Sequence, residues 1–298
     1  MNFDLTDDQR EIKRTARDFL AARYPLERVR AIALDGEPDP HWDAIVELGW
    51  PDVAELGILE LALVAEELGA SLAPSPLSAH WAAKLLHPGL EGRGTVATWA
   101  GAVPHAAGAD VIVVDEGSRL LAVTGAEASP VRALDPTRPL YAIRYDGGEE
   151  LARDERAWQA IAVMTAAEAV GVAARVTRMA VDYAKERKQF GRPIGSYQAV
   201  SHACAQMFLE TEGARAVTYW AAWALDHDPS VAALASASAK AYASDAAVNV
   251  ARSALQVHGG IGFTWEHDLH LFLKRAETLA RAYGDARSQR ERVAAELL

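Results

Sequence analysis

The sequence predicts a mainly α-helical protein with a small β-domain between two helical regions. Apolar residues recur at three- and four-residue steps before residue 95 and after residue 153, as on one face of a helix. Between these regions, short apolar runs are separated by Gly, Pro and Asp, which is typical of strands. We therefore expect an N-terminal helical domain (residues 1–94), a short middle β-domain (95–153) and a C-terminal four-helix bundle (154–298).

The N-terminal domain is predicted to begin with a helix that Thr6 caps. Its apolar stripe consists of Ile12, Ala16, Phe19 and Leu20. Residues 35–40, rich in Pro, Gly and Asp, are predicted to form a loop. Three further helices are predicted over Trp42–Leu48, Leu56–Leu68 (ended by Gly69) and Ala79–Leu86.

The middle and C-terminal regions differ in their hydrophobic period. Strands are predicted over Thr95–Trp99, Val111–Val114, Leu120–Val123 and Tyr141–Tyr145. Long helical runs follow over residues 158–183, 200–225, 231–257 and 269–297. Glycine-rich segments at 191–195 and 259–262 interrupt them, and such short joins favour an antiparallel bundle.

Composition excludes several classes of function. The net charge of −11 argues against a nucleic-acid-binding protein, which normally carries a basic face. The single cysteine, Cys204, excludes an intrachain disulfide and any multi-cysteine metal cluster, and no His, Asp or Glu spacing resembles a metal site. The N-terminal residues do not resemble a signal peptide, and no run of 18 apolar residues predicts a membrane-spanning helix. We therefore expect a cytoplasmic protein.

The segment 183–198 gathers four cations at a predicted helix end: Lys185, Arg187, Lys188 and Arg192. Cations suit the negative C-terminal end of a helix, and this interpretation needs no ligand. Alternatively, they form a phosphate site, because guanidinium groups pair with phosphate through forked N–H donors. Charge alone favours the first interpretation.

The segment 256–266 places three glycines directly after a long helix. Glycines there can form a helix cap and turn, or they can let the backbone approach an anionic ligand closely. His258 within this segment is interpreted as a hydrogen-bonded structural residue rather than a catalytic one.

Together, the order and spacing of these segments resemble the acyl-CoA dehydrogenase family. That family carries an Arg-x-Gln-Phe-Gly-x-Pro-Ile motif and, further along its C-terminal bundle, a Gln-x-His-Gly-Gly-x-Gly motif. Both motifs stand here in full, at residues 187–194 and 256–262. The resemblance extends from the opening segment, residues 3–6, through the β-domain to the bundle, and it implies an acyl-CoA dehydrogenase-like fold.

The resemblance also implies FAD at a subunit interface. The arginine matching Arg187 would reach the pyrophosphate of a FAD held mainly by the neighbouring subunit. Gln189 and Phe190 would flank it, and Gln198 would lie near the adenine. The residues that would approach the same dinucleotide from the second motif are Gln256, Gly259 and Gly260.

The half of the family site that surrounds the flavin ring has no clear counterpart in this sequence. The middle domain is shorter than the family's, and Gly125–Pro130 and Thr137 are poor substitutes for its hydroxyl-bearing loop. Many members carry a catalytic glutamate before Gly-Thr in the last helical region, where Tyr283 stands here. Asp285 and Glu168 are weak candidates for a base, and Glu168 is interpreted as solvated or as a helix–helix polar contact.

This pattern resembles the short subunit of actinobacterial heteromeric acyl-CoA dehydrogenases, which form α2β2 assemblies. It implies a base-bearing dehydrogenase subunit as partner, an acyl-CoA substrate such as a sterol side-chain thioester, and an electron-transfer flavoprotein or similar acceptor. Two alternatives stay open. One is a self-sufficient homo-oligomeric dehydrogenase with an unrecognised base, and the other is a non-enzymatic helical scaffold.

Overall fold

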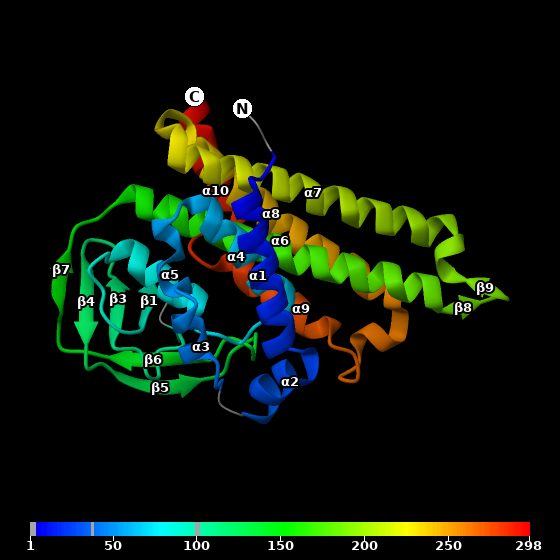
Figure 1. The fold of residues 1–298 in the computed structure, drawn as a ribbon, viewed down its shortest axis with the longest axis horizontal. Coiled ribbons are helices and arrows are strands. Elements are labelled where there is room, and N and C mark those ends of the chain that lie inside the picture. Colours follow the sequence, from blue (N-terminus) through cyan, green and yellow to red (C-terminus); the bar gives the residue numbers. More distant parts are fainter. Residues whose placement is uncertain (1–3, 37–38, 99–101) are drawn as a thin grey trace.

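The computed structural model describes residues 4–36, 39–98 and 102–298, and it confirms the predicted mainly helical fold with a small β-region. Figure 1 shows the sheets at one end of the molecule and the long helices α6, α7 and α8 extending away from them. The N-terminal elements are α1 (Asp7–Arg23), α2 (Leu26–Asp35), α3 (Trp42–Glu47), the 3-10 helix η1 (Trp50–Glu55), α4 (Ile58–Ser71) and α5 (Leu77–Leu86).

The first helix begins where the sequence predicts. The Thr6 side chain accepts a hydrogen bond from the backbone N–H of Gln9 at 3.2 Å, and the Gln9 side chain accepts one from the Thr6 N–H at 3.0 Å. This reciprocal pair satisfies donors that a helix N-terminus leaves free. The predicted apolar stripe is present, since Ala16 and Leu20 are fully buried or nearly so.

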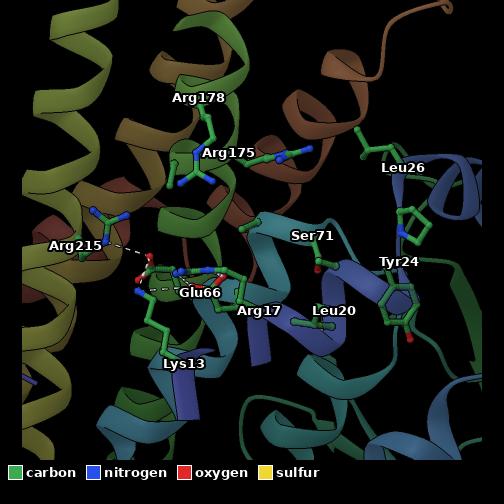
Figure 2. A pocket seen from close by; sticks show the side chains of 15 residues that line it. Lys13, Arg17, Leu20, Tyr24, Leu26, Glu66, Ser71, Arg175, Arg178 and Arg215 are labelled. Carbon is green, nitrogen blue, oxygen red and sulfur yellow. Dashed lines mark hydrogen bonds and ion pairs between the residues drawn. The ribbon is translucent and has the colours of Figure 1, made fainter. Parts of the chain in front are cut away.

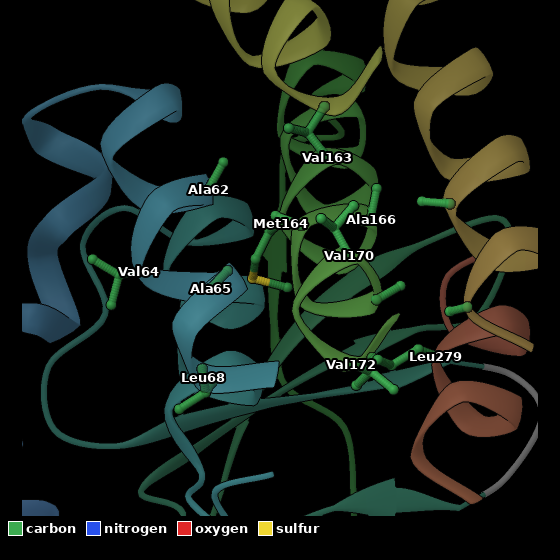
Figure 3. Packing of buried hydrophobic residues seen from close by; sticks show 14 of the residues in the cluster. Ala62, Val64, Ala65, Leu68, Val163, Met164, Ala166, Val170, Val172 and Leu279 are labelled. Carbon is green, nitrogen blue, oxygen red and sulfur yellow. The ribbon is translucent and has the colours of Figure 1, made fainter. Parts of the chain in front are cut away.

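The prediction that Gly69 ends the helix over Leu56–Leu68 is wrong. The helix α4 continues to Ser71 and is capped by Leu72, which has a φ of 55°. Gly69 is instead a contact point with α6, because a Cβ there would lie 2.0 Å from the carbonyl oxygen of Glu168. Gly171 of α6 is a matching contact point, because a Cβ there would lie 1.8 Å from the backbone carbonyl oxygen of Glu66 in α4. The two helices therefore meet backbone to backbone, and apolar side chains such as Leu68 fill the surrounding core (Figure 3).

The β-region consists of two small sheets, in the orders β1-β3-β4-β7 and β2-β6-β5. Among the strands of the described residues, the β1–β3 pair is parallel and the other pairs of these sheets are antiparallel. The strands are β1 (Gly94–Thr98), β2 (Val103–Pro104), β3 (Val111–Asp115), β4 (Leu120–Thr124), β5 (Glu127–Val131), β6 (Leu140–Arg144) and β7 (Glu149–Leu151). All four predicted strands are present, although Trp99 lies outside the described residues. The sequence missed β2, β5 and β7, because they are very short or largely exposed and carry no apolar run.

The C-terminal bundle contains α6 (Glu155–Glu186), α7 (Gln198–His227), α8 (Pro229–His258), α9 (Leu269–Arg281) and α10 (Ala286–Leu297). The predicted run over 269–297 is two helices rather than one. The helix α9 ends at Arg281 because Ala282 is extended, and Tyr283 and Gly284, with positive φ of 56° and 101°, reverse the chain before α10.

Helix α6 lies at the centre of the packing. Of the described helices, it is the one that is long and apolar enough to cross a membrane. However, 89% of its apolar stretch is buried inside the protein, where it packs against α4, α7 and α8. Its hydropathy is therefore explained by its position in the core.

Candidate functional site

The first motif forms the turn at the far end of α6 from the sheets. The hairpin of β8 (Lys188–Gln189) and β9 (Arg192–Pro193), followed by the 3-10 helix η2 (Ile194–Ser196), joins α6 to α7 (Figure 1). The Arg187 backbone N–H donates to the Tyr183 oxygen at 2.8 Å, and the Arg187 oxygen accepts from Ile194 N–H at 2.8 Å. This turn fixes the backbone from which the Arg187 side chain projects.

The Arg187 side chain is exposed and makes no hydrogen bond or ion pair with any residue within the described ranges. It stands at the negative end of α6, as the helix-dipole interpretation expects, yet its guanidinium donors remain free for an anion. Phe190, three residues on, is 94% exposed and has a φ of 51°. The ring meets Tyr197 edge-on, with centroids 6.4 Å apart, and its exposed surface is available to another molecule.

Gln189 and Gln198 flank this turn. The backbone oxygen of Gln189 accepts a hydrogen bond from the Tyr197 hydroxyl at 3.2 Å. The Gln189 side-chain amide donates to the backbone oxygen of Lys188 at 2.8 Å. Gln198 is exposed and is the first residue of α7. The hairpin therefore brings Arg187, Gln189 and Phe190 onto one short segment, with Gln198 directly after it.

The second motif ends α8 and continues into the 3-10 helix η3 (Gly259–Phe263). Gly259 has φ 64° and ψ −144°, a conformation that essentially only glycine adopts. A Cβ at Gly259 or Gly260 would meet nothing within 4 Å, and the neighbouring Gln256 side chain is exposed. The backbone at these two glycines is therefore open to close approach, whereas Gly262 packs against His258 and Leu255.

His258 links the two motifs. It is 4% exposed, its Nδ1 bonds the Ala254 carbonyl at 2.8 Å, and its ring stacks on Tyr183 with a centroid distance of 4.5 Å. Burial lowers the pKa of His258, which favours the neutral ring. These contacts fit the structural role expected for His258. Because Tyr183 precedes Arg187 by one helical turn, the stack also places the ends of α6 and α8 side by side.

Tyr283, which the family resemblance predicts at the position of the catalytic base, lies in the loop between α9 and α10. It lines a cavity of only about 10 Å³ with residues of α5, α6 and the β-region, among them His105, Arg138, Met164 and Thr165. Burial raises the pKa of Tyr283 to about 12, so the phenol stays protonated at neutral pH. A space of this size holds about one water molecule and leaves no room for a flavin ring or a thioester.

Glu168 is fully buried and forms two ion pairs. Its two oxygens lie 2.7 Å from Arg275 of α9 and 2.5 Å from Arg138 of the loop before β6. The expectation of a solvated side chain is wrong, and the alternative of a helix–helix polar contact is confirmed. Both carboxylate oxygens of Glu168 are therefore engaged by guanidinium groups, which leaves neither of them free for a substrate proton.

Arg275 completes this charge cluster. It binds Asp135 at 2.6 Å and the Thr137 hydroxyl at 2.5 Å while being only 1% exposed. Thr137, considered as a substitute for the family's flavin loop, therefore serves the cluster. The cluster of Asp135, Arg138, Glu168 and Arg275 joins the β-region to α6 and α9. Sequence reasoning missed Arg275, although its position on the apolar stripe of α9 was a usable signal.

Asp285 is an exposed helix cap. Its side chain accepts a hydrogen bond from the Ser288 backbone N–H at 2.8 Å, and this bond lowers the Asp285 pKa. Within the described ranges, no group of three His, Cys, Asp or Glu side chains could hold a metal ion.

Lys240, which sequence reasoning also missed, fixes the loop that carries Tyr283. Its buried ammonium group donates to the oxygens of Leu279 and Gly284 and to the Ser244 hydroxyl, each at 3.0 Å. Burial lowers the Lys240 pKa to about 8. The Tyr283 loop is therefore held by a buried cation, and Tyr283 itself packs partly buried against the core.

Comparison with known proteins gives one consistent result. The family model described as "Acyl-CoA dehydrogenase, C-terminal domain" matches residues 156–298. The chain is 35% identical over 254 residues to acyl-CoA dehydrogenase IpdE2 of Mycobacterium tuberculosis, covering 80% of this chain and 78% of that protein. A similar match, at 34% identity over 252 residues, covers 80% of this chain and 79% of IpdE2 of Mycolicibacterium smegmatis.

Solved structures have the same fold. A chain of the Mycobacterium tuberculosis ChsE4–ChsE5 complex superimposes with a TM-score of 0.85 at 22% identity, covering 100% of this chain and 99% of that one. A variant of the Tcur3481–Tcur3483 steroid acyl-CoA dehydrogenase gives a TM-score of 0.86 at 22% identity, covering 98% of each chain.

Proposed function

The chain belongs to the acyl-CoA dehydrogenase family, and we propose that it is a subunit that completes the FAD site of a partner dehydrogenase while lacking a catalytic base of its own. The observation that carries this proposal is the contrast within the chain. The side chains of Arg187 and Gln256 in the two motifs are exposed and have no hydrogen bond or ion pair with the described residues, whereas the position that we match to the family base is closed and holds a phenol.

The residues at the hairpin end fit a dinucleotide diphosphate. Arg187 offers a forked set of N–H donors, and the open backbone at Gly259 and Gly260 allows an anionic group to approach closely. Gln256 adds an exposed carboxamide. In this proposal these groups bind and orient the diphosphate of a FAD seated mainly in the partner.

The cavity lined by Tyr283 does not fit a flavin ring. Its cavity is too small, and the buried charges around it are satisfied by one another. When bound, FAD supplies the two-electron oxidant for removal of the β-hydrogen of an acyl-CoA as hydride. The base that takes the α-proton would come from the partner chain, since Glu168 and Asp285 are engaged in an ion cluster and a helix cap.

Names of similar proteins indicate which partner and substrate to try first. One structure of the same fold comes from a two-component complex, and another is described as a steroid acyl-CoA dehydrogenase. We therefore propose a base-bearing acyl-CoA dehydrogenase as partner and a steroid-derived acyl-CoA as first test substrate. An electron-transfer flavoprotein, or a similar carrier, would accept the electrons.

The proposal is tested by producing the chain alone and together with a base-bearing family member encoded near it. We expect a colourless isolated chain and a complex that holds FAD and oxidises the thioester with a dye acceptor. An isolated chain that binds FAD, oxidises acyl-CoA and loses activity on Glu168→Gln or Asp285→Asn substitution would instead support a self-sufficient enzyme. Absence of FAD from every assembly would support a helical scaffold.

A further inference from the structure

A second cavity lies apart from the residues discussed above. It has a volume of about 380 Å³ and is lined by residues of α1, α4, α6 and α7 and the start of α2 (Figure 2). It shares no lining residue with the Tyr283 cavity or with either dinucleotide motif. Its volume falls in the range of pockets that bind small molecules, roughly 300–1,000 Å³.

The two carboxylates of this cavity already have counter-ions. Glu66 lies 2.9 Å from Lys13 and 3.1 Å from Arg215, and it also accepts the Tyr219 hydroxyl at 2.6 Å. Glu67 binds Arg17 at 2.7 Å. Glu212 is a further partner of Arg215, so three carboxylates neutralise the three cations on that side of the cavity.

Two arginines of the cavity have no such partner. Arg175 and Arg178 stand three residues apart on α6, and neither makes a hydrogen bond or ion pair with any residue in 4–36, 39–98 or 102–298. Side chains at this spacing share one helix face and can reach the same group. Figure 2 shows both arginines on the side of the cavity opposite Lys13, with their side chains extending in different directions. The cavity thus carries two unneutralised positive charges in a chain whose net charge is −11.

The remaining wall is mostly apolar, with Tyr24 and Ser71 as the residues that carry a hydroxyl group. Its apolar part is formed by small and branched side chains, namely Leu20, Ala21, Pro25, Leu26, Ala70 and Ala174. A ligand matched to this cavity therefore has an anionic end beside the arginines and a carbon portion against these side chains.

We propose that this cavity binds a small organic dianion, either a phosphate monoester or a dicarboxylate, through Arg175 and Arg178. Guanidinium forks match the oxygens of both groups, and two unpaired positive charges match a double negative charge. The carbon portion of the ligand lies against Leu20 and Leu26. This site is independent of the flavin function proposed above.

The test is isothermal titration calorimetry of the full chain at low ionic strength, with phenyl phosphate and with succinate as probes. We expect at least one probe to bind and to raise the melting temperature. The double substitution R175Q/R178Q should raise its Kd by about tenfold or more, because each arginine contributes charge-assisted hydrogen bonds. Binding of one probe alone would identify the preferred anionic group.

The matched control is Arg156→Gln, an exposed arginine at the other end of α6, which should bind like the wild type. Circular dichroism and the melting temperature without ligand check that every variant is folded. Binding of neither probe, or equal binding by the wild type and the double variant, would overturn the proposal.

Discussion

The two halves of α6 face very different surroundings. In the first half, Glu168 is paired with two arginines, and Met164 and Thr165 line a cavity that holds about one water molecule. At the far end, Arg187 has no partner among the described residues, and Gly259 and Gly260 face open space. Polar groups that satisfy one another stabilise the fold, whereas polar groups left free on a shaped surface are available to another molecule.

The largest effect on stability is expected at Arg275. Substitution Arg275→Met would leave Asp135 buried without a cation and Glu168 with only Arg138. Removing one partner of a buried ion pair costs about 3–5 kcal/mol, so we expect a loss of this size in the free energy of unfolding by urea denaturation.

The control for Arg275 is the surface pair of Arg290 with Asp245. Arg290→Met should cost less than about 1 kcal/mol, because exposed ion pairs contribute little. Equal losses for the two variants would contradict the view that the Glu168 region is the packed half of α6.

Because of Lys240, the free energy of unfolding should increase with pH in the alkaline range. Its pKa is about 8 in the folded chain against an ordinary value of 10.5, because burial disfavours the charge more than nearby Asp285 and Asp245 favour it. Between these two values the unfolded chain binds more protons, so this contribution to stability rises with pH, by roughly 3 kcal/mol in all.

The measurement for Lys240 is the free energy of unfolding of wild type and Lys240→Met from pH 7 to 10.5. The wild type should gain relative to the variant as the pH rises above about 8. A constant difference between the two proteins would show that Lys240 does not titrate in this range.

Gly69 lies in a tightly packed helix contact, whereas Gly260 lies at an open surface, so the same substitution should have different effects at the two positions. Gly69→Ala would place a methyl group 2.0 Å from the backbone carbonyl oxygen of Glu168. It should lower the free energy of unfolding by about 1–3 kcal/mol or more. Gly260→Ala meets nothing within 4 Å and should change the free energy of unfolding by less than about 0.5 kcal/mol.

Flavin content of the Gly260→Ala variant tests whether this glycine contributes to cofactor binding as well as to the surface. In a complex with the partner, we expect Gly260→Ala to lower FAD retention despite its normal stability. Normal FAD retention by this variant would show that the Gly260 backbone is not approached by the dinucleotide.

Candidate residues at the exposed end of α6 could be singled out from the sequence, whereas the buried cluster around Glu168 could not. Arg187, Gly259 and Gly260 stand in contiguous motifs, so their neighbours could be recognised along the chain. The packed half joins residues far apart, since Arg275 bonds Glu168 across 107 positions and Asp135 across 140. Such pairs follow from tertiary packing, which hydrophobic periodicity does not specify.

Helix ends show the same difference. Thr6 and Gln9 form a local capping box that the sequence signals partly disclosed. Gly69 looked like a helix end, but its small size serves the contact with α6, and the break at Tyr283 interrupts an otherwise continuous helical pattern. Local chemistry was therefore predictable, and the use of a glycine or a tyrosine in packing was not.

The most direct test of the central claim is the FAD content of the complex formed with a base-bearing partner, measured by absorbance for wild type and Arg187→Ala. We expect the wild-type complex to retain FAD, and the variant complex to assemble with unchanged stability but a FAD Kd about tenfold higher or more. Arg156→Ala serves as the control and should retain FAD normally. Equal FAD retention by wild type and Arg187→Ala would contradict the account.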